Sequence, residues 1–168
     1  SFYKDAKLRR ITRYRYNNVP GDNGARNYYL SLMDSNAVNA KPIDTWSPTF
    51  LPCKTPLDSY KCRQGIGYTV FEAAKHGIES KLTAFVPLKT NAEVNRLDVT
   101  NTTDAPVVLD VTGSVEWCLW NAVDDSSNFQ RNLSTGEVEI EKQDDATLIY
   151  HKTEFKERRN HYAFFAVN

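Results

Sequence analysis

The chain has 168 residues, with 21 basic and 21 acidic side chains, so its formal net charge is zero. This length suits one domain that buries roughly 70% of its unfolded surface, and the charge balance excludes a broad electrostatic surface for nucleic acid, which must neutralise many phosphates. No apolar run is long enough to span a membrane and no charged-then-apolar leader opens the sequence, so we expect neither nucleic acid nor membrane as a partner.

Most of the chain has the sequence pattern of β-strands, taken here in chain order. Segments rich in β-branched and aromatic residues predict strands at 9–16, 66–74, 79–86, 95–101, 106–120, 136–142, 146–152 and 161–167. Turn signals separate them at 20–24, at His76-Gly77 and at 101–106. Residues 31–45 are expected to form a surface loop or insertion, and no segment shows a capped helical stripe. The pattern predicts an all-β sandwich.

The stretch from Ser114 to Glu141 combines the alternating sequence pattern of a strand with a long polar loop. Its alternation of apolar and polar residues stops at Asn121 and resumes at Glu137. The loop between them carries amide and guanidinium side chains at Asn121, Asn128, Gln130, Arg131 and Asn132. Such groups suit the hydroxyls of a sugar, and the neighbouring aromatic rings suit its C–H faces. A hairpin loop with solvated polar side chains is the alternative, and composition leaves both open.

Neither the cysteines nor the histidines predict a metal site. Cys53, Cys62 and Cys118 cannot all pair, and none lies at C-x-x-C spacing. The three histidines likewise lack the spacing of metal ligands. Reduced thiols in a cytoplasmic protein are the simpler interpretation.

Several strings together resemble a known family. They are RITRYRYNN at 10–18, WSP at 46–48, KT at 54–55, YKCRQGIGY at 60–68, EWCLWNA at 116–122, NFQRNLSTG at 128–136 and YHKTEFKERRNHY at 150–162. In this order they resemble the amino-terminal part of the cellobiose phosphorylases, within the inverting disaccharide phosphorylases of glycoside hydrolase family 94. The resemblance extends over residues 1–168.

The resemblance implies that residues 1–168 form the amino-terminal domain of a longer phosphorylase chain, a large antiparallel two-sheet β-sandwich (super-sandwich). A helical barrel domain would follow and hold the catalytic aspartate and the phosphate site, so no catalytic residue and no metal ligand is expected here. The implied enzyme is a hexosyltransferase that reversibly converts cellobiose and phosphate to glucose 1-phosphate and glucose. Inorganic phosphate is then a co-substrate, and no cofactor is expected.

The resemblance also implies site residues and a homodimer. In this family the sandwich of one protomer lies against the barrel of the other, and the loop matching 121–131, which we call the flap, closes over the leaving glucose. Asn128, Gln130 and Arg131 are therefore expected to contact that sugar, with Asn121 and Arg158 as neighbours that shape the flap. Arg158 could equally belong to a surface ion network with Arg159 and nearby glutamates.

A further set of aromatic residues is expected to fill the sandwich core or its contact with the barrel: Trp46, Tyr60, Tyr68, Trp117, Phe164 and Phe165. The flap differs from the usual family sequence at 124–127, so the identity of the disaccharide substrate stays open. Cellobiose is the first choice, followed by laminaribiose, a longer cellodextrin or chitobiose. A non-catalytic carbohydrate-binding sandwich and a purely structural assembly domain remain as alternatives.

Overall fold

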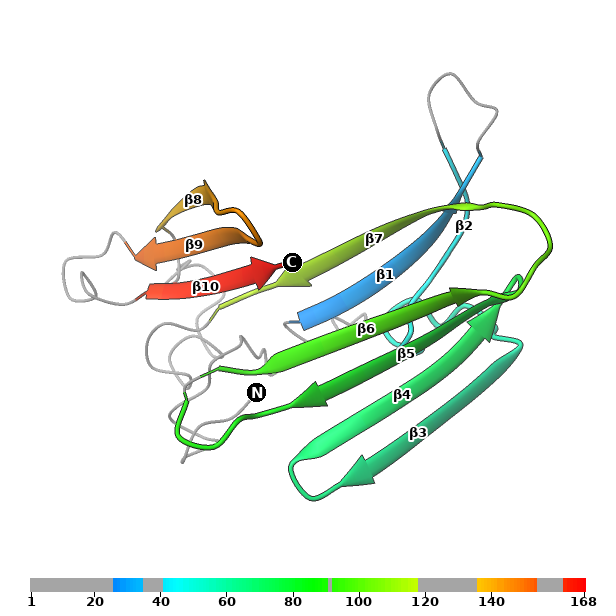
Figure 1. Ribbon diagram of the computed structural model, residues 1–168, viewed down its shortest axis with the longest axis horizontal. Coiled ribbons are helices and arrows are strands. Elements are labelled where there is room, and N and C mark those ends of the chain that lie inside the picture. Colours follow the sequence, from blue (N-terminus) through cyan, green and yellow to red (C-terminus); the bar gives the residue numbers. More distant parts are fainter. Residues whose placement is uncertain (1–25, 35–40, 91, 118–135, 154–161) are drawn as a thin grey trace, which may run out of the picture. The chain divides into compact units, whose positions relative to one another are not determined.

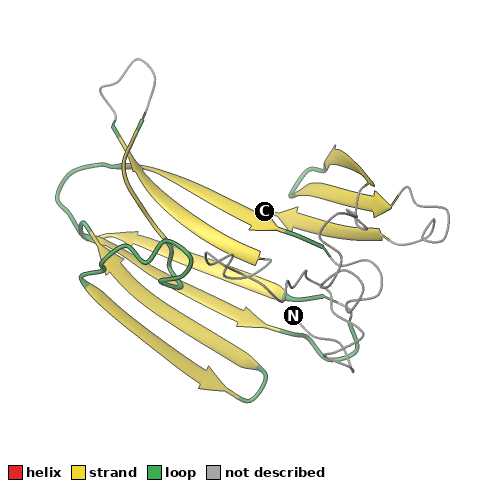
Figure 2. Cartoon of the chain, turned by 180° about the vertical axis from the view of Figure 1, so that it is seen from behind, coloured by secondary structure: helices red, strands yellow, loops and turns green. Residues whose placement is uncertain are grey.

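The computed structural model describes residues 26–34, 41–90, 92–117, 136–153 and 162–168. These residues form strands, turns and loops, and none of them is helical (Figure 2). The all-β class predicted from the sequence is therefore confirmed. Within these ranges no helix of the length and apolarity needed to cross a membrane occurs.

The chain divides into two compact units. Residues 26–114 form one unit, and residues 1–25 together with 115–168 form the other. The first unit contains two sheets, labelled in Figure 1. One has the order β2–β1–β7, from β1 (Arg26–Met33), β2 (Pro42–Trp46) and β7 (Val108–Val115). The other is an antiparallel meander of β3 (Ser59–Gly65), β4 (Tyr68–Lys75), β5 (Ile78–Phe85) and β6 (Val94–Asn101).

Strand β5 shows why the meander has two unlike faces. Ile78, Ser80 and Leu82 are 1–3% exposed, whereas Glu79 and Lys81 between them are exposed to solvent. Successive strand side chains point to opposite faces, so this alternation defines an inner and an outer face of the sheet.

The turn that leads into β5 has the backbone that the sequence signal requires. His76 and Gly77 both have positive φ, at 55° and 72°. Two such residues in succession give the primed turn whose twist matches antiparallel strands, so the predicted turn at His76-Gly77 is confirmed.

The core lies between the two sheets. Leu30 and Trp46 of the first sheet and Ile78 of the meander form one cluster and are 0–1% exposed. Leu32, Leu57, Leu97 and Leu109 pack against that cluster. Because both sheets contribute to one core, the first unit is a two-layer sandwich, as the sequence pattern predicted.

The described part of the second unit is a three-stranded sheet of order β10–β9–β8. It comprises β8 (Gly136–Lys142), β9 (Thr147–Thr153) and β10 (Tyr162–Val167), all antiparallel. The register places Val138, His151 and Ala163 in one cross-strand row, and Ile140, Ile149 and Phe165 in another on the same face. Three glutamates of β8, at 137, 139 and 141, alternate with these apolar residues and therefore point to the other face.

Seven of the eight predicted strands fall in the described ranges, and each has a counterpart there. The predictions at 66–74, 79–86, 95–101, 136–142, 146–152 and 161–167 match β4, β5, β6, β8, β9 and β10 to within about two residues. The predicted strand at 9–16 lies outside the described residues.

Two sequence predictions were wrong. The strand predicted at 106–120 ends as β7 at Val115, with an isolated bridge at Trp117. Glu116 lies between β7 and this bridge without strand pairing, and residues 118–120 lie outside the described residues. The predicted loop at 31–45 instead contains the end of β1 and most of β2, which pair as an antiparallel hairpin.

Candidate functional site

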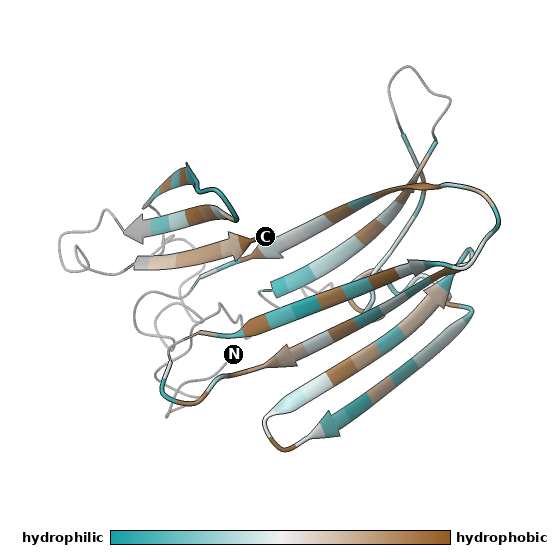
Figure 3. Ribbon diagram, viewed as in Figure 1, coloured by the Kyte–Doolittle hydropathy of each residue, from teal (hydrophilic) through white to brown (hydrophobic). Residues whose placement is uncertain are grey.

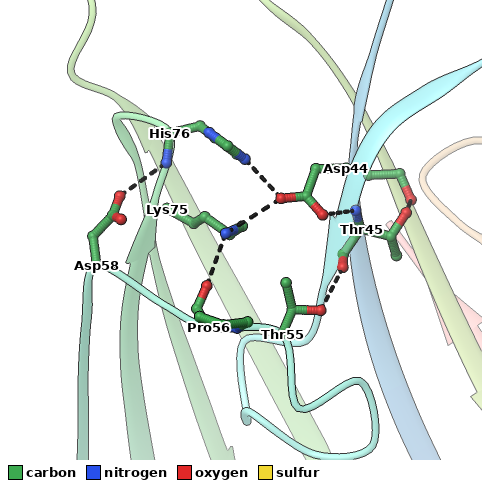
Figure 4. Close-up of polar contacts among 8 residues, drawn as sticks. Asp44, Thr45, Thr55, Pro56, Asp58, Lys75 and His76 are labelled. Carbon is green, nitrogen blue, oxygen red and sulfur yellow. Dashed lines mark hydrogen bonds and ion pairs between the residues drawn. The ribbon is translucent and has the colours of Figure 1, made fainter.

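A cluster of polar residues joins β2 to the β4–β5 turn of the sandwich (Figure 4). Asp44 is its centre. Oδ2 of Asp44 lies 2.7 Å from His76 Nε2 and 3.3 Å from Lys75 Nζ, and Oδ1 accepts the backbone N–H of Thr45 at 2.8 Å. Lys75 Nζ also donates to the carbonyl of Pro56 at 2.8 Å. One carboxylate therefore links the two sheets with the segment that precedes β3.

Backbone groups complete this cluster. The N–H of His76 donates to Asp58 Oδ2 at 3.0 Å, and the Thr55 hydroxyl donates to the carbonyl of Thr45 at 2.9 Å (Figure 4). The Thr45 hydroxyl also lies 2.9 Å from that of Ser31 on β1. Each of these residues thus has at least one hydrogen-bond partner within the sandwich.

The electrostatics of the cluster favour a structural role. Hydrogen bonding to His76, helped by Lys75 and the Thr45 N–H, lowers the pKa of Asp44, against a smaller opposing effect of burial. A carboxyl group with a lowered pKa is ionised at neutral pH and cannot donate a proton as a general acid. The cluster is therefore a clasp between layers, and we call Asp44, Lys75, His76, Asp58 and Thr55 the clasp.

The five predicted site residues lie in segments outside the described residues: Asn128, Gln130 and Arg131, expected to contact the sugar, and Asn121 and Arg158, expected to shape the flap. The structure does describe the strands to which these segments are joined. The segment 118–135 leads into β8 at Gly136, and the segment 154–161 joins the end of β9 to the start of β10.

Both segments are attached at the same end of the three-stranded sheet. Gly136 is paired with Thr153, and Tyr162 with Lys152, so the start of β8, the end of β9 and the start of β10 lie side by side (Figure 1). Arg131 precedes Gly136 by five residues and Arg158 follows Thr153 by five. Five residues span at most about 18 Å, which limits how far the backbone of either arginine can lie from this sheet end.

The aromatic residues predicted for the core divide into two groups. Trp46 is fully buried, which confirms the prediction for that residue, and Trp117 and Phe165 are half-buried. Tyr60, Tyr68 and Phe164 are 43–54% exposed and do not belong to the core of the described residues. Tyr60 lies on β3, which among the described strands is paired only with β4; a contact of these exposed rings with another domain stays a prediction.

The described cysteines are both free thiols. Cys53 is half-buried, and burial is the main reason why its pKa is raised; Cys62 is exposed on β3. Cys118 lies outside the described residues. Among the residues that the structure describes, no group of three histidine, cysteine or acidic side chains is arranged to hold a metal ion.

Sequence reasoning missed the clasp because it lies partly in the stretch expected to be a loop. A signal was present: Tyr28, Leu30 and Leu32 alternate with polar residues, which is the period of a half-buried strand. That strand requires a partner, and Pro42–Trp46 after a short polar stretch is the nearest candidate. Recognising the hairpin would have placed Asp44 on a strand.

Comparison with known proteins gives one family over the whole sequence. The family described as "Glycosyl hydrolase 94, supersandwich domain" matches residues 1–168. An N,N'-diacetylchitobiose phosphorylase of Vibrio furnissii is 30% identical over 83% of the chain, and another of Vibrio proteolyticus is 29% identical over 79%. A solabiose phosphorylase of Paenibacillus borealis is 32% identical over 55% of the chain.

These relatives are far longer than the sequence compared with them. The chain spans 17% of the V. furnissii protein, 16% of the V. proteolyticus protein and 12% of the P. borealis protein. The similarity therefore concerns one domain of each.

Proposed function

Since this chain belongs to glycosyl hydrolase family 94 as its supersandwich domain, we propose that the complete protein is an inverting disaccharide phosphorylase and that this domain shapes its acceptor-sugar site. The observation that carries the proposal is the match of the family description to residues 1–168. The two-layer sandwich is consistent with this family. A fold alone does not define an activity, so the proposal rests on the family match.

The proposed reaction requires two groups from outside this domain. An oxygen of inorganic phosphate attacks the anomeric carbon of the non-reducing sugar and forms the new C–O bond with inversion. The glycosidic C–O bond breaks, and a carboxylic acid elsewhere in the protein gives its proton to the leaving sugar hydroxyl. Phosphate is already an anionic nucleophile, so no second carboxylate is needed to activate water, unlike in an inverting hydrolase.

The proposed contribution of this domain is recognition of the leaving sugar by the flap. Asn128 and Gln130 can each donate and accept hydrogen bonds, and Arg131 presents a planar set of donors to adjacent hydroxyls. The common attachment of the flap and of the Arg158 segment to one sheet end supports placing these side chains in one site. Covering the site would also exclude water, which competes with phosphate for the anomeric carbon.

Two disaccharides are the main candidates for the substrate. Cellobiose follows from the resemblance of the sequence strings, whereas the Vibrio relatives, which match 83% and 79% of the chain, are named for N,N'-diacetylchitobiose. Both are β-linked, and they differ at the substituent on carbon 2. Because a P. borealis relative is named for solabiose, disaccharides with other linkages also remain candidates for the substrate.

The test is an assay of the complete protein with inorganic phosphate and a panel of disaccharides: cellobiose, laminaribiose, N,N'-diacetylchitobiose and solabiose. We expect phosphate-dependent release of a sugar 1-phosphate from one of them, with the α configuration visible by NMR. Sugar binding without any sugar 1-phosphate, across the whole panel, would replace the proposal with the carbohydrate-binding module. A reaction that proceeds equally without phosphate would make the protein a hydrolase.

We further propose a cytoplasmic homodimer, in which the flap of one protomer completes the site of the other. Mixing two impaired variants tests the second point. A protein with Arg131→Ala and a protein lacking its catalytic acid should together exceed the activity of either alone if the flap acts across the dimer, and should show no gain if it acts within one chain.

A further inference from the structure

Exposed aliphatic side chains gather at one end of the meander. Ile66 lies in the turn between β3 and β4, and Val86 and Leu88 lie in the connection between β5 and β6. Ile66 and Leu88 are 105% and 91% exposed, and Val86 is exposed as well. Figure 3 shows brown, apolar segments at this turn and at the adjoining ends of β5 and β6.

A row of larger residues on the outer face continues this surface. The register sets Tyr68 opposite Phe85, and Phe85 opposite Val94, and all three are more than a third exposed. A methyl group on Gly65 would lie 2.3 Å from the ring carbons of Tyr68. Glycine at this position therefore lets the tyrosine ring lie over β3. We call Ile66, Tyr68, Phe85, Val86, Leu88 and Val94 the apolar end.

Charged side chains occupy much of the rest of the same face. Arg63 pairs with Glu72 at 2.5 Å, and Arg96 pairs with Asp98 at 2.8 Å. The exposed Lys81 lies in register with Glu72 and Asp98. Opposite charges across strands suit a solvated sheet face, whereas contiguous exposed apolar patches are uncommon on soluble proteins and mark interaction sites.

Cations border the apolar end. Arg63 and Arg96 occupy the row next to Tyr68 and Phe85, and the exposed Lys89 follows Leu88. The nearby carboxylate of Glu93 forms an ion pair with Arg26. Glu72 and Asp98 balance the charges of Arg63 and Arg96 on the same face. A twofold contact would bring the Lys89 side chains of two copies toward one another, because each patch would meet itself. The position of Lys89 therefore disfavours a second copy as the occupant.

We propose that the apolar end is the docking surface for a part of the same polypeptide outside residues 1–168, whose contact surface is apolar at its centre and carries carboxylates or backbone carbonyls at its margin. The relatives support this choice of occupant, since the chain spans only 17% and 16% of the two Vibrio proteins. The inference rests on the proposed function only in taking the domain to be part of such a longer enzyme.

Cysteine accessibility in the complete protein tests the proposal. Ile66→Cys and Leu88→Cys are compared with Lys81→Cys, a control on the charged part of the same sheet, each in a Cys62→Ser background that removes an exposed thiol. In the native state we expect maleimide to modify the two test positions about a hundredfold more slowly than the control, because modification requires local opening. All three should react alike after denaturation. Equal native rates would overturn the proposal.

Photocrosslinking then identifies the occupant. A benzoylphenylalanine replacing Ile66 should join to a peptide beyond residue 168 of the same chain. A crosslink to any part of residues 1–168, or to a second copy in a mixture of isotopically light and heavy protein, would overturn the choice of occupant. The phosphorolysis assay is separate: protected positions in a protein without phosphorolysis remove the proposed function and leave the docking surface in place.

Discussion

The sandwich of residues 26–114 and the sheet β8–β9–β10 are both made of short, alternating strands, yet they bury their side chains to very different degrees. In the sandwich, Leu30, Trp46 and Ile78 are at most 1% exposed. In the described part of the three-stranded sheet, Ala163 at 9% is the only buried side chain, while Ile140 and Phe164 are exposed.

We interpret this difference as a division of roles. The sandwich supplies stability, and the segments attached to the three-stranded sheet are proposed to supply specificity for the sugar. A three-stranded sheet with open faces has little stability of its own, whereas two packed layers share a core. Among the described residues, the sandwich supplies most of the buried apolar side chains, whereas the segments proposed to recognise sugar are attached to the three-stranded sheet. We therefore expect substitutions in the two regions to have different kinds of effect.

The largest expected effect is on the core. Trp46→Ala should lower the free energy of unfolding by about 3–5 kcal/mol, because it removes a fully buried ring and leaves a cavity. Phe164→Ala, at a 54% exposed ring of β10, should cost about 1 kcal/mol or less. Hydrogen exchange of the strand amides in the complete protein measures both. Similar losses at the two sites would contradict the comparison.

The next effect is on function. Arg131→Ala should reduce use of the acceptor sugar about 10- to 100-fold, as expected for the loss of one or two charged hydrogen bonds. The thermal unfolding of the protein should not change. Kinetics in the synthetic direction, with sugar 1-phosphate and varied acceptor, give the acceptor KM and kcat; unchanged values for both would count against the flap. Arg96→Ala, on the charged sheet face, is the matched control.

Two turn glycines of the sandwich test a smaller effect. Gly77→Ala places a methyl group 2.4 Å from Thr103 Cγ2 at φ 72°, whereas Gly67→Ala meets open space at φ 84°. Both should lose about 1–2 kcal/mol from the left-handed backbone, and Gly77→Ala should lose about 1 kcal/mol more from the clash. Denaturant unfolding gives the difference, and a larger loss for Gly67→Ala would refute this account of the turn.

The clasp should give the smallest effect and a defined pH dependence. The pKa of Asp44 is lowered from 3.8 in the folded state, so its ionised form contributes stability above that value and loses it as the pH falls through the lowered pKa. Asp44→Asn should therefore cost about 1 kcal/mol or less at pH 7, and the difference from wild type should shrink below about pH 4.

Unfolding measured at pH 7 and at pH 3 gives the two values for the clasp. The exposed Glu79→Gln serves as the control, with an expected change within about 0.5 kcal/mol at pH 7. A difference between Asp44→Asn and wild type that grows on acidification would contradict the assigned role of Asp44.

The strands that could be predicted have one apolar face and a recognisable turn. β4 and β5 meet at His76-Gly77, and β5 alternates strictly between buried and exposed residues. Of the strands that were missed, β2 and β3 lack such signals, whereas β1 carries the alternation of Tyr28, Leu30 and Leu32. All seven residues of β3 are exposed because it is an edge strand, and β2 begins with Pro42, which edge strands tolerate.

The sequence predicted the chemistry of the candidate site but not the positions of its residues. Amides and an arginine in one long loop indicate hydroxyl recognition, but their positions depend on where the strands end. The common attachment of the flap and of the Arg158 segment follows from the pairing of Gly136 with Thr153 and of Tyr162 with Lys152. That register joins residues that are 17 and 10 positions apart (153 − 136 and 162 − 152), and no local pattern encodes it.

The sheet order β2–β1–β7 has a consequence for synthesis on the ribosome. β1 ends at Met33 and its neighbour β7 begins at Val108, so the chain must grow by 75 residues (108 − 33) before this sheet can close. At roughly 5–20 residues per second the wait is about 4–15 s. Until β5 with Ile78 has been synthesised, Leu30 and Trp46 have no opposite layer to pack against, so the nascent hairpin is expected to need a chaperone that shields apolar segments.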